Sequence, residues 1–497
     1  GRRVVICESH STPGGAAHGF QRKLPKDGGE FSFDTGPSFF SGLSDPKGAR
    51  INPLKAVLDL LDVQLPCHQY RSFGLCLPEG DFLHTPEFGE QILRQVSGPS
   101  ASREWEGLLT AMKPLAALVE ALPVPALRLD AGALLTVAPF LPRFLAAGPL
   151  NAQQLNDPFA RTVERAGVTD PFARRWLDLL CFCLSGLPAD GTVTAEMAMM
   201  FGEFYKPQAI MDYPVGGVKS LVEALVKGLE SHGGSLRLNT PVKQLVMSSG
   251  TCHGVELVNG DVLEASSVVC NVSAWDLPKL LPTSVSSQTW CRERAAMPAT
   301  KSFMHLHVGF DARSLELKQL QPHYICLEDW TRGVEAEENA VLISIPSVED
   351  PSLAPEDCGV LHAYTPATEP WERWKDLDRR SAEYKALKEQ RAEFLWKQLE
   401  RIIPDLRQRS KVHMIGTPLT HQRFLNRHQG SYGPRIKAGE AEFPGASTPI
   451  AGLVLCGDSC FPGIGVPAVA GSGLLAAHAT GLETLPAQLK ELQRLFS

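Results

Sequence analysis

Residues 452–473 of this chain read GLVLCGDSCFPGIGVPAVAGSG. The apolar run at the start is typical of a short buried strand, and the glycines after it indicate a tight turn. Pro467 suits the first turn of a helix, so the stretch predicts a strand, a turn and a helix. Gly457 and Asp458 then stand at the tip of the strand. The helix start near Gly465 offers free N–H groups to negative charge, although the same three parts also occur as a purely structural unit.

A second strand-like stretch lies almost at the beginning of the chain, where residues 4–9 read VVICES. Glu8 at its end can hydrogen-bond both hydroxyls of an adenosine ribose. Gly14 and Gly15 follow in a Pro-Gly-Gly turn, and glycines let the backbone approach a pyrophosphate closely. An ordinary strand end and turn explain these residues as well, so this stretch becomes informative only together with the other one.

The middle of the chain contains elements of the same kind. Residues 211–246 predict a turn, a helix, a second turn and a bent strand or strand pair. Asn259-Gly260 between alternating residues is a strong hairpin signal. Residues 266–273, SSVVCNVS, predict a buried strand.

The segments between these elements have a different pattern. We expect a helix at residues 52–62, mostly helices from 69 to 203, and a charged, solvated helix at 379–403. Residues 303–310 and 339–347 predict strands.

The order of the elements indicates an interleaved architecture. Residues 1–65, 205–300 and 440–497 are expected to form one cofactor-binding domain from three pieces of chain. Residues 66–204 and 301–439 are expected to form a substrate-binding domain.

Composition excludes some classes of protein. The chain has 497 residues, a formal net charge of −7 and 43% hydrophobic residues, with no basic block. We therefore expect a globular protein that does not bind nucleic acid. The 12 cysteines are scattered and form no pair of CxxC motifs, which argues against a zinc site of that kind and fits a reducing compartment.

Two apolar segments bear on membrane contact. Residues 459–482 carry no charged side chain, but their glycines and prolines favour a buried loop and helix over a membrane span. Residues 122–150 are interrupted by Arg143 and by prolines. This second segment could lie on a bilayer surface, line an apolar tunnel, or form a pair of core helices.

Taken together, these stretches resemble the phytoene desaturase and carotenoid (prolycopene) isomerase family of FAD-dependent oxidoreductases. The resemblance covers nearly the whole chain, and it rests on residues 8–20, 31–42, 212–242, 428–434 and 452–473. It implies an α/β fold. In that fold a Rossmann-type FAD-binding domain is interleaved with an α+β substrate domain, as in the amine oxidase and phytoene desaturase flavoproteins.

The resemblance also implies a cofactor site. Glu8 would bind the FAD ribose, and the backbone of Val242 would meet the adenine. The residues expected along the pyrophosphate and ribityl chain are Gly14, Gly15, Gly457 and Asp458, and those expected to face the isoalloxazine are Ile464, Gly465 and Val466.

The chain departs from the family pattern in two ways. The family begins with a strand, a GxGxxG loop and a helix, about thirty residues in all, and this element is absent here. We expect it upstream of Gly1; the alternative is a protein that has lost FAD. In addition, TPGGAA at residues 12–17 lacks the arginines that many relatives carry beside the paired glycines.

The resemblance implies cis–trans isomerisation or desaturation of a carotenoid-like polyene, with FAD supplying the chemistry. It further implies a plastid protein that makes peripheral membrane contact, or a cytoplasmic or thylakoid-associated one if bacterial. The alternatives are a retinol-saturase-like or amine-oxidase-like flavoenzyme, or a non-enzymatic lipid-binding protein with the fold of the GDP-dissociation inhibitors. The oligomeric state stays open.

No acid–base motif stands out, so no catalytic residue is named. The polar candidates near the motifs are His18, Tyr213, His428 and Tyr432. His305 and His307 share one face of a strand with a metal-like spacing. No third ligand follows them in sequence, so a metal is not expected.

Overall fold

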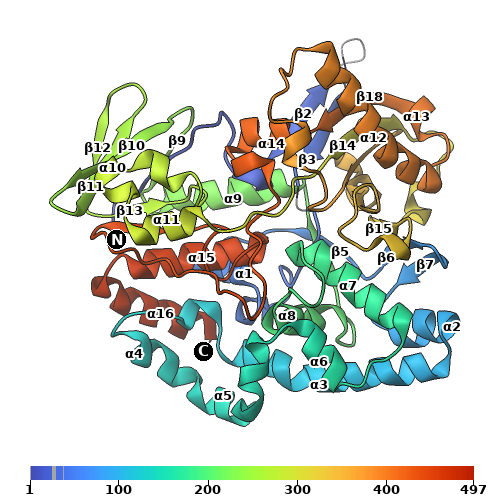
Figure 1. Ribbon diagram of the computed structural model, residues 1–497, viewed down its shortest axis with the longest axis horizontal. Coiled ribbons are helices and arrows are strands. Elements are labelled where there is room, and N and C mark those ends of the chain that lie inside the picture. Colours follow the sequence, from blue (N-terminus) through green and yellow to red (C-terminus); the bar gives the residue numbers. More distant parts are fainter. Residues whose placement is uncertain (1, 25–28, 37, 497) are drawn as a thin grey trace.

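The computed structural model describes residues 2–24, 29–36 and 38–496, and Figure 1 shows two parts side by side. On the left lie short parallel strands, a small β-meander and the C-terminal helices. On the right lie a large sheet and a helical layer.

Strands from the beginning, the middle and the end of the chain associate in the first part. β1 (Val5–Cys7) pairs in parallel with β9 (Ser235–Arg237), and β13 (Val268–Cys270) pairs in parallel with β19 (Leu453–Leu455). Parallel pairing between such distant segments is the mark of an α/β fold, and it confirms the interleaved architecture. The exact domain boundaries stay a prediction.

The predicted hairpin is present in an antiparallel meander. Its strands are β10 (Val242–Ser248), β11 (Thr251–Leu257) and β12 (Val262–Glu264). Between the last two strands Gly260 has a φ of +92°, a left-handed conformation that favours glycine. The Asn-Gly signal therefore located this turn correctly.

Four helices complete the first part, and their starts show why they begin where they do. The helices are α1 (Pro53–Leu60), α9 (Val218–Ser231), α15 (Val466–Ala479) and α16 (Leu485–Phe496). The side chain of Asn52 caps α1 by accepting a hydrogen bond from the N–H of Leu54 at 2.9 Å. Pro467 lies in the first turn of α15, where the missing N–H of proline costs no helical hydrogen bond.

The second part is built on a seven-stranded sheet in the order β18-β14-β17-β16-β15-β6-β7. The strands are β6 (Phe73–Leu77), β7 (Gly80–His84), β14 (His305–Asp311), β15 (His323–Leu327), β16 (Ala340–Ser344), β17 (Cys358–Tyr364) and β18 (Ser410–Gly416). Neighbouring strands are antiparallel except β15 and β6, which run parallel. The predictions of strands at 303–310 and 339–347 are confirmed.

The expectation of helices from residue 69 onward was wrong for its first part. Three strands occupy this region: β5 (Cys67–Tyr70), β6 and β7. All five residues of β6 are buried, so it lacks the alternation of apolar and polar residues that identifies a strand. β5 instead joins a small sheet with β4 (Phe40–Ser41) and β8 (Met211–Pro214).

Helices cover the large sheet. α12 (Ala382–Ile402) packs one face against it through Leu395, Trp396 and Leu399, so the predicted charged helix is solvated on its other side only. The helices between residues 94 and 204 are α2 (Arg94–Val96), α3 (Pro99–Ala121), α4 (Ala133–Val137), α5 (Leu141–Ala146), α6 (Phe159–Arg165), α7 (Pro171–Ser185) and α8 (Thr194–Phe204), and α4 lies against α16. The remaining short elements are β2 (Gly19–Lys23), β3 (Glu30–Asp34), α10 (Thr283–Ser286), α11 (Thr289–Ala295), α13 (Leu406–Arg409) and α14 (Pro418–Leu425).

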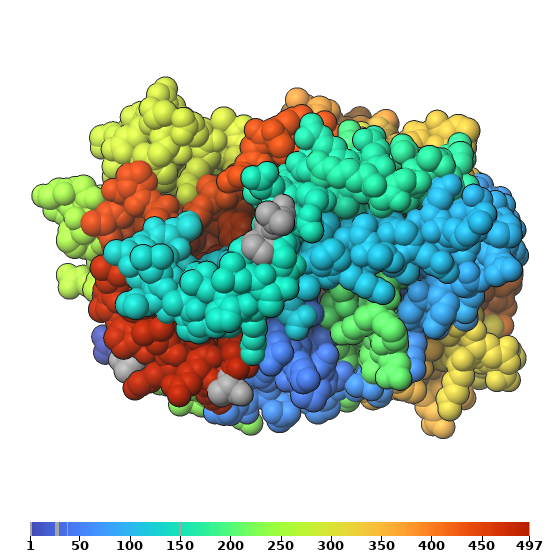
Figure 2. All heavy atoms as spheres, turned by 90° about the horizontal axis from the view of Figure 1, so that it is seen from below, coloured from blue at the N-terminus to red at the C-terminus, as the bar shows by residue number. Residues whose placement is uncertain are grey.

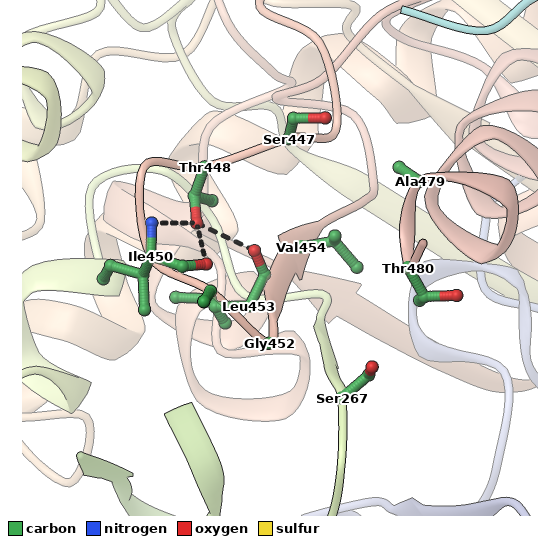
Figure 3. Close-up of a pocket in the computed structure, with 10 residues that line it drawn as sticks. Ser267, Ser447, Thr448, Ile450, Gly452, Leu453, Val454, Ala479 and Thr480 are labelled. Atoms are coloured by element: carbon green, nitrogen blue, oxygen red, sulfur yellow. Dashed lines mark hydrogen bonds between the residues drawn. The ribbon is translucent and has the colours of Figure 1, made fainter. Parts of the chain in front are cut away.

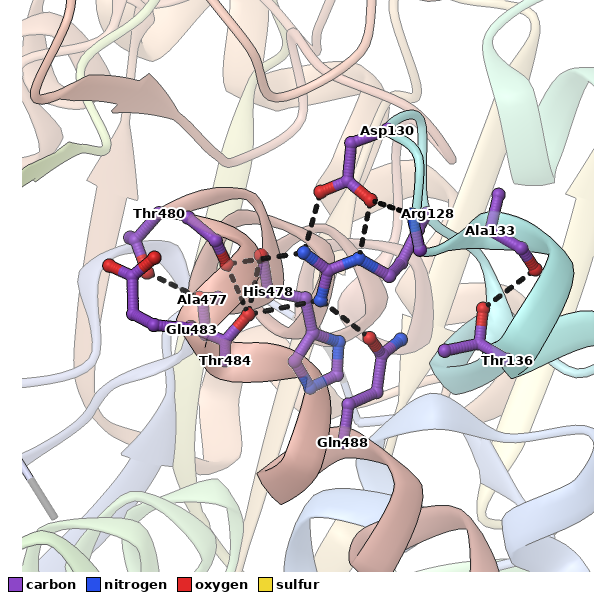
Figure 4. A network of polar contacts seen from close by, with 12 residues as sticks. Arg128, Asp130, Ala133, Thr136, Ala477, His478, Thr480, Glu483, Thr484 and Gln488 are labelled. Carbon is purple, nitrogen blue, oxygen red and sulfur yellow. Dashed lines mark hydrogen bonds and ion pairs between the residues drawn. The ribbon is translucent and has the colours of Figure 1, made fainter.

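A buried arginine fastens the segment before α4 to the C-terminal helices (Figure 4). The side chain of Arg128 is 1% exposed and forms an ion pair of 2.5 Å with Asp130. It also donates hydrogen bonds to Thr484 at 3.0 Å, to Gln488 at 2.8 Å and to the carbonyl of Gly481 at 3.2 Å. A buried guanidinium with every partner in place holds this segment firmly against the start of α16.

Among the described residues, no helix combines the length and the apolarity that crossing a bilayer requires.

Candidate functional site

The end of β1 lies against the loop before β10. The N–H of Thr240 donates to the carbonyl of Glu8 at 2.8 Å, and the N–H of Asn239 donates to the carbonyl of His10 at 3.0 Å. The Glu8 carboxylate accepts a hydrogen bond of 2.7 Å from the N–H of His10. Val242 follows two residues after Thr240, so the two residues expected around an adenosine group lie in one neighbourhood.

The paired glycines form an exposed turn beside helix α9. Gly14 and Gly15 have φ angles of +113° and +55°. A Cβ on Gly14 would lie 2.8 Å from the Val222 side chain, whereas a Cβ on Gly15 would meet nothing within 4 Å. The hydroxyl of Thr35 donates to the carbonyl of Ala16 at 2.9 Å, and this hydrogen bond stabilises the turn. Gly15 is therefore open to a ligand that approaches the backbone.

The Gly-Asp pair at the end of β19 is closely packed on one side. Gly457 has a φ of +105°, and a Cβ there would lie 2.4 Å from the Oδ1 of Asn271, which directly follows β13. Its N–H donates to the hydroxyl of Ser472 in α15 at 3.1 Å. Asp458 accepts a hydrogen bond of 2.7 Å from Arg427. These contacts fix the Gly-Asp pair between the end of β13, α15 and Arg427.

A single dipeptide links the two ends of the site. The side chain of Asn426 donates to the hydroxyl of Ser9 at 3.2 Å, and Arg427 forms the ion pair with Asp458. The residue after Glu8 and the Gly-Asp pair therefore border the same loop, although they are far apart in the sequence.

The start of α15 faces open space. Gly465 is exposed, has a φ of +102°, and a Cβ there would meet nothing within 4 Å. Ile464 before it packs on Gly433, where an added Cβ would lie 2.6 Å from the isoleucine side chain. Residues 466–470 are all apolar or proline but only half buried. A helix that is apolar all round is normally covered, so this helix start has the character of a binding surface for a flat apolar ring.

The parallel strands leave an uncovered apolar edge. Within the described residues β1 pairs only with β9, and β13 pairs only with β19. Val5, Ile6 and Val269 are 41%, 44% and 46% exposed. The expectation of a buried strand at 266–273 was therefore wrong at Val269, because parallel strands are buried only where neighbours cover them.

A cavity of about 190 Å³ opens at the opposite end of these strands (Figure 3). Ser267 and Gly452, which line it, precede β13 and β19. Ligands of open α/β sheets bind at the carboxyl ends of the strands, so this cavity is not the cofactor site. Thr480 also lines it and accepts a hydrogen bond of 2.8 Å from Arg2.

Asp34 and Tyr213 form a buried structural pair. The tyrosine hydroxyl donates to Asp34 at 2.7 Å, and the N–H of Val218 at the start of α9 donates to the other carboxylate oxygen at 2.9 Å. Burial raises the pKa of Asp34 to about 6, against the opposing effect of these two hydrogen bonds. Tyr213 thus has a structural partner inside the protein.

We expect Asp34→Asn to remove a pH dependence of stability. Between about pH 4 and pH 6 the folded protein binds this proton more tightly than the unfolded chain, so the free energy of unfolding falls as pH rises through that window. The raised pKa of Asp34 corresponds to about 3 kcal/mol of stability that the unmodified protein loses as pH rises. The variant has no such carboxyl group, so its free energy of unfolding should not fall in this way. Urea unfolding at pH 4, 5, 6 and 7 checks this. Asp261→Asn, at an exposed turn, is the control, and an equal pH dependence in both variants would refute the assignment.

The other polar candidates also have partners in the protein. His18 contacts the carbonyl of Gly15 at 2.7 Å through Nδ1, and the hydroxyl of Tyr432 donates to the carbonyl of Cys183 at 3.3 Å. His428 stacks on Trp275 with ring centroids 5.0 Å apart. None of these contacts assigns a catalytic role.

Sequence reasoning missed three residues that organise the site. Asn271 and Arg427 contact the Gly-Asp pair, and Asn426 reaches the end of β1. The one available signal was their position, inside the strand predicted at residues 266–273 for Asn271 and directly before the motif at residues 428–434 for Asn426 and Arg427.

Comparison with known proteins agrees with this geometry. The model of the family described as flavin containing amine oxidoreductase matches residues 1–480. Prolycopene isomerase 1, chloroplastic, of an Oncidium hybrid cultivar is 31% identical over 504 residues, which cover 96% of this chain and 79% of that protein. The neurosporene-forming phytoene desaturase of Cereibacter sphaeroides is 28% identical over 53% of each chain. Putrescine oxidase bound to putrescine is similar in structure, with a TM-score of 0.59, 14% identity, and coverage of 98% of this chain and 93% of that one.

Proposed function

Because this chain belongs to the family of flavin-containing amine oxidoreductases, we propose that it is an FAD-dependent enzyme that isomerises or desaturates a carotenoid-like polyene. The observation that carries the proposal is the likeness to a prolycopene isomerase over 96% of the chain. The end of β1, the start of β10 and the Gly-Asp pair lie around one loop, and this arrangement supports the proposal.

The residues present fit an FAD molecule. The Glu8 carboxylate would accept hydrogen bonds from the ribose hydroxyls, with Val242 beside the adenine. Gly15 has open space where a Cβ would stand, and this permits close approach of the pyrophosphate, together with Gly14. Gly457 and Asp458 would lie along the ribityl chain.

The start of α15 would hold the ring system. Ile464, Gly465 and Val466 offer an apolar surface and the first N–H groups of a helix. The positive end of the helix dipole favours negative charge on the ring edge that it faces. The bound flavin would supply the redox chemistry, and these residues would orient it and exclude water.

We propose that one more parallel strand completes this site between β1 and β13. Such a strand would cover Val5, Ile6 and Val269, and a helix after it would direct its N-terminus at the pyrophosphate. The GxGxxG element that the resemblance implies has this form.

We further propose that an exposed apolar surface around α4 and α5 contacts a membrane. On α4, on α5 and just before them, five leucines are exposed: Leu129 at 82%, Leu134 at 83%, Leu135 at 58%, Leu141 at 47% and Leu145 at 65%. Figure 2 shows this segment in teal on the outer face, against the red C-terminal residues. Arg128 anchors the segment to α16, so the backbone that carries the leucines is held in place. An apolar substrate dissolved in a bilayer would reach the enzyme through such a surface.

Replacing Leu129, Leu134 and Leu145 together by glutamine is expected to weaken binding to lipid vesicles at least about tenfold. Each leucine removed from the bilayer surface loses on the order of 1 kcal/mol of transfer free energy. Flotation with phosphatidylcholine vesicles measures the bound fraction. Val258→Gln with Val262→Gln changes exposed valines elsewhere and is the control. Equal binding by both variants would rule out this surface.

The location of the protein is proposed from its relatives. The curated names of the Oncidium and Arabidopsis thaliana relatives include the word chloroplastic. We propose a plastid location for this chain, peripheral to a membrane.

The decisive experiment is a product analysis. The purified protein is loaded with FAD, and its visible spectrum shows whether a flavin is bound. Separate cis-carotenoids and phytoene in vesicles are then incubated with the flavin reduced or oxidised, and the products are separated by chromatography. A change in double-bond geometry identifies an isomerase, and a longer conjugated system identifies a desaturase.

Two versions of the chain make the result unambiguous. One is the 497-residue chain, and the other carries the strand–GxGxxG–helix element of a prolycopene isomerase ahead of Arg2. Flavin binding that is stronger in the second version supports the added strand. Turnover of no carotenoid by either flavin-loaded version would refute the proposed function.

A further inference from the structure

Three buried histidines meet on one face of the large sheet. His305 and His307 lie on β14, and His362 lies opposite His307 on β17. One ring nitrogen from each of the three lies within 4.8 Å of the others. The spacing of the first two residues was visible in the sequence. The third comes from a neighbouring strand and could not be found by looking for a ligand nearby in the chain.

Three hydrogen-bond contacts involve the nitrogens of these rings. Nε2 of His307 contacts the carbonyl of Asp34 at 3.0 Å, and Nε2 of His362 contacts the hydroxyl of Ser38 at 3.1 Å. Nε2 of His305 and Nδ1 of His362 lie 3.0 Å apart. Histidines that bind a metal commonly direct the second ring nitrogen at a carbonyl or hydroxyl oxygen, which orients the ring. Two of the three rings have that arrangement.

The nitrogens that do not contact Asp34 or Ser38 converge in the same place. Nε2 of His307 is the nitrogen that contacts Asp34, which leaves Nδ1 on the other side of the ring, and this ring stacks on His305 with centroids 4.0 Å apart. The set that would bind is therefore Nε2 of His305, Nδ1 of His307 and Nδ1 of His362.

The three imidazoles are buried close to one another. Burial, together with the neighbouring imidazoles, lowers the pKa of His305 and of His362 well below the usual value. Burial also lowers the pKa of His307 to about 4.

A fourth buried histidine lies beside the cluster. His421 stacks on Phe303, and its ring centroid lies 6.4 Å from that of His305. Its buried Nε2 has no hydrogen-bond partner among the described residues. A buried nitrogen without a partner is costly, and a water on a bound ion would supply one.

We propose that His305, His307 and His362 form a binding site for a divalent cation of the late first-row series, with Zn²⁺ as the type. Three neutral imidazoles and no carboxylate favour Zn²⁺, Co²⁺, Ni²⁺ or Cu²⁺ over Mg²⁺ or Ca²⁺. The fourth position of a tetrahedral ion is left to water. The ion would join β14 to β17 beneath the segment around Asp34 and Ser38. The site does not depend on the proposed flavin function.

Titration of the full chain with Zn²⁺ and Co²⁺ tests the site. We expect one equivalent of Zn²⁺ to be retained after dialysis, and one equivalent of Co²⁺ to give the intense visible absorption of a tetrahedral complex. His307→Gln and His362→Gln should each weaken Co²⁺ binding by at least about 100-fold. Ser38→Ala, which keeps all three ligands, should weaken it by about 10-fold to 100-fold.

His84→Gln is the matched control, because His84 is also buried on this sheet and contacts the hydroxyl of Tyr205 at 3.0 Å, yet it lies outside the three-histidine set. It should bind Co²⁺ like the unmodified chain. Failure of the unmodified chain to retain Zn²⁺ or Co²⁺ overturns the proposal, whatever the variants do. Binding that persists at equal strength in His307→Gln and His362→Gln also overturns it, since the ion would then lie elsewhere.

Discussion

Gly465→Val is expected to abolish flavin binding while the protein still folds. The φ of +102° at this position disfavours a β-branched residue, and the strain should cost about 1–2 kcal/mol. A Cβ here meets no protein atom within 4 Å, so no internal packing is disturbed. The added methyl groups would occupy the space in front of α15 where the ring system is proposed to lie. Titration of the apoprotein with FAD should show affinity reduced by at least about 100-fold.

Gly333→Val is the matched control for this prediction. Gly333 is also exposed, has a φ of +76°, and a Cβ there meets nothing within 4 Å, but it lies after β15 in the substrate part. Gly333→Val introduces the same kind of backbone strain as Gly465→Val, but its side chain does not lie at the start of α15. Equal loss of FAD affinity in the two variants would show that strain is responsible, and intact FAD binding by Gly465→Val would contradict the proposed ring position.

Glu369→Ala is expected to cause the largest loss of stability. The side chain of Glu369 is 2% exposed and that of Arg391 is 9% exposed, and their ion pair is 2.6 Å long. Glu369 also accepts a hydrogen bond of 2.8 Å from the indole of Trp374. Removal of the carboxylate leaves a largely buried guanidinium with its two remaining partners, Glu337 and Glu338. Breaking such a pair costs about 3–5 kcal/mol, which urea unfolding measures.

The control for this variant is Glu393→Ala. Glu393 pairs with Arg407 at 2.9 Å, but the two side chains are 64% and 43% exposed. Solvent screens such a pair, so its loss should cost about 0–1 kcal/mol. Glu369→Gln, which keeps an acceptor for Trp374, should fall between the two. A loss from Glu369→Ala no larger than the control would show that the buried pair contributes little.

The sequence by itself determined the elements that depend on neighbouring residues. Asn259-Gly260 located the hairpin, Pro467 and the glycines before it located the start of α15, and the apolar run before Gly457 located β19. Turn chemistry, helix capping and short-range periodicity are local properties, so they can be read along the chain. The resemblance to a flavoprotein family rests on the same local motifs, and it gave the fold class and the candidate cofactor residues.

Only the tertiary structure decided which distant segments meet. It placed Asn426 and Arg427 between the ends of β1 and β19, and it set His362 beside His305 and His307. Strand register and loop paths bring such residues together, and both depend on the packing of the whole sheet. The same cause explains the errors. β6 is buried on both faces and so lacks a strand pattern, and Val269 is exposed because its strand has a neighbour on one side only among the described residues.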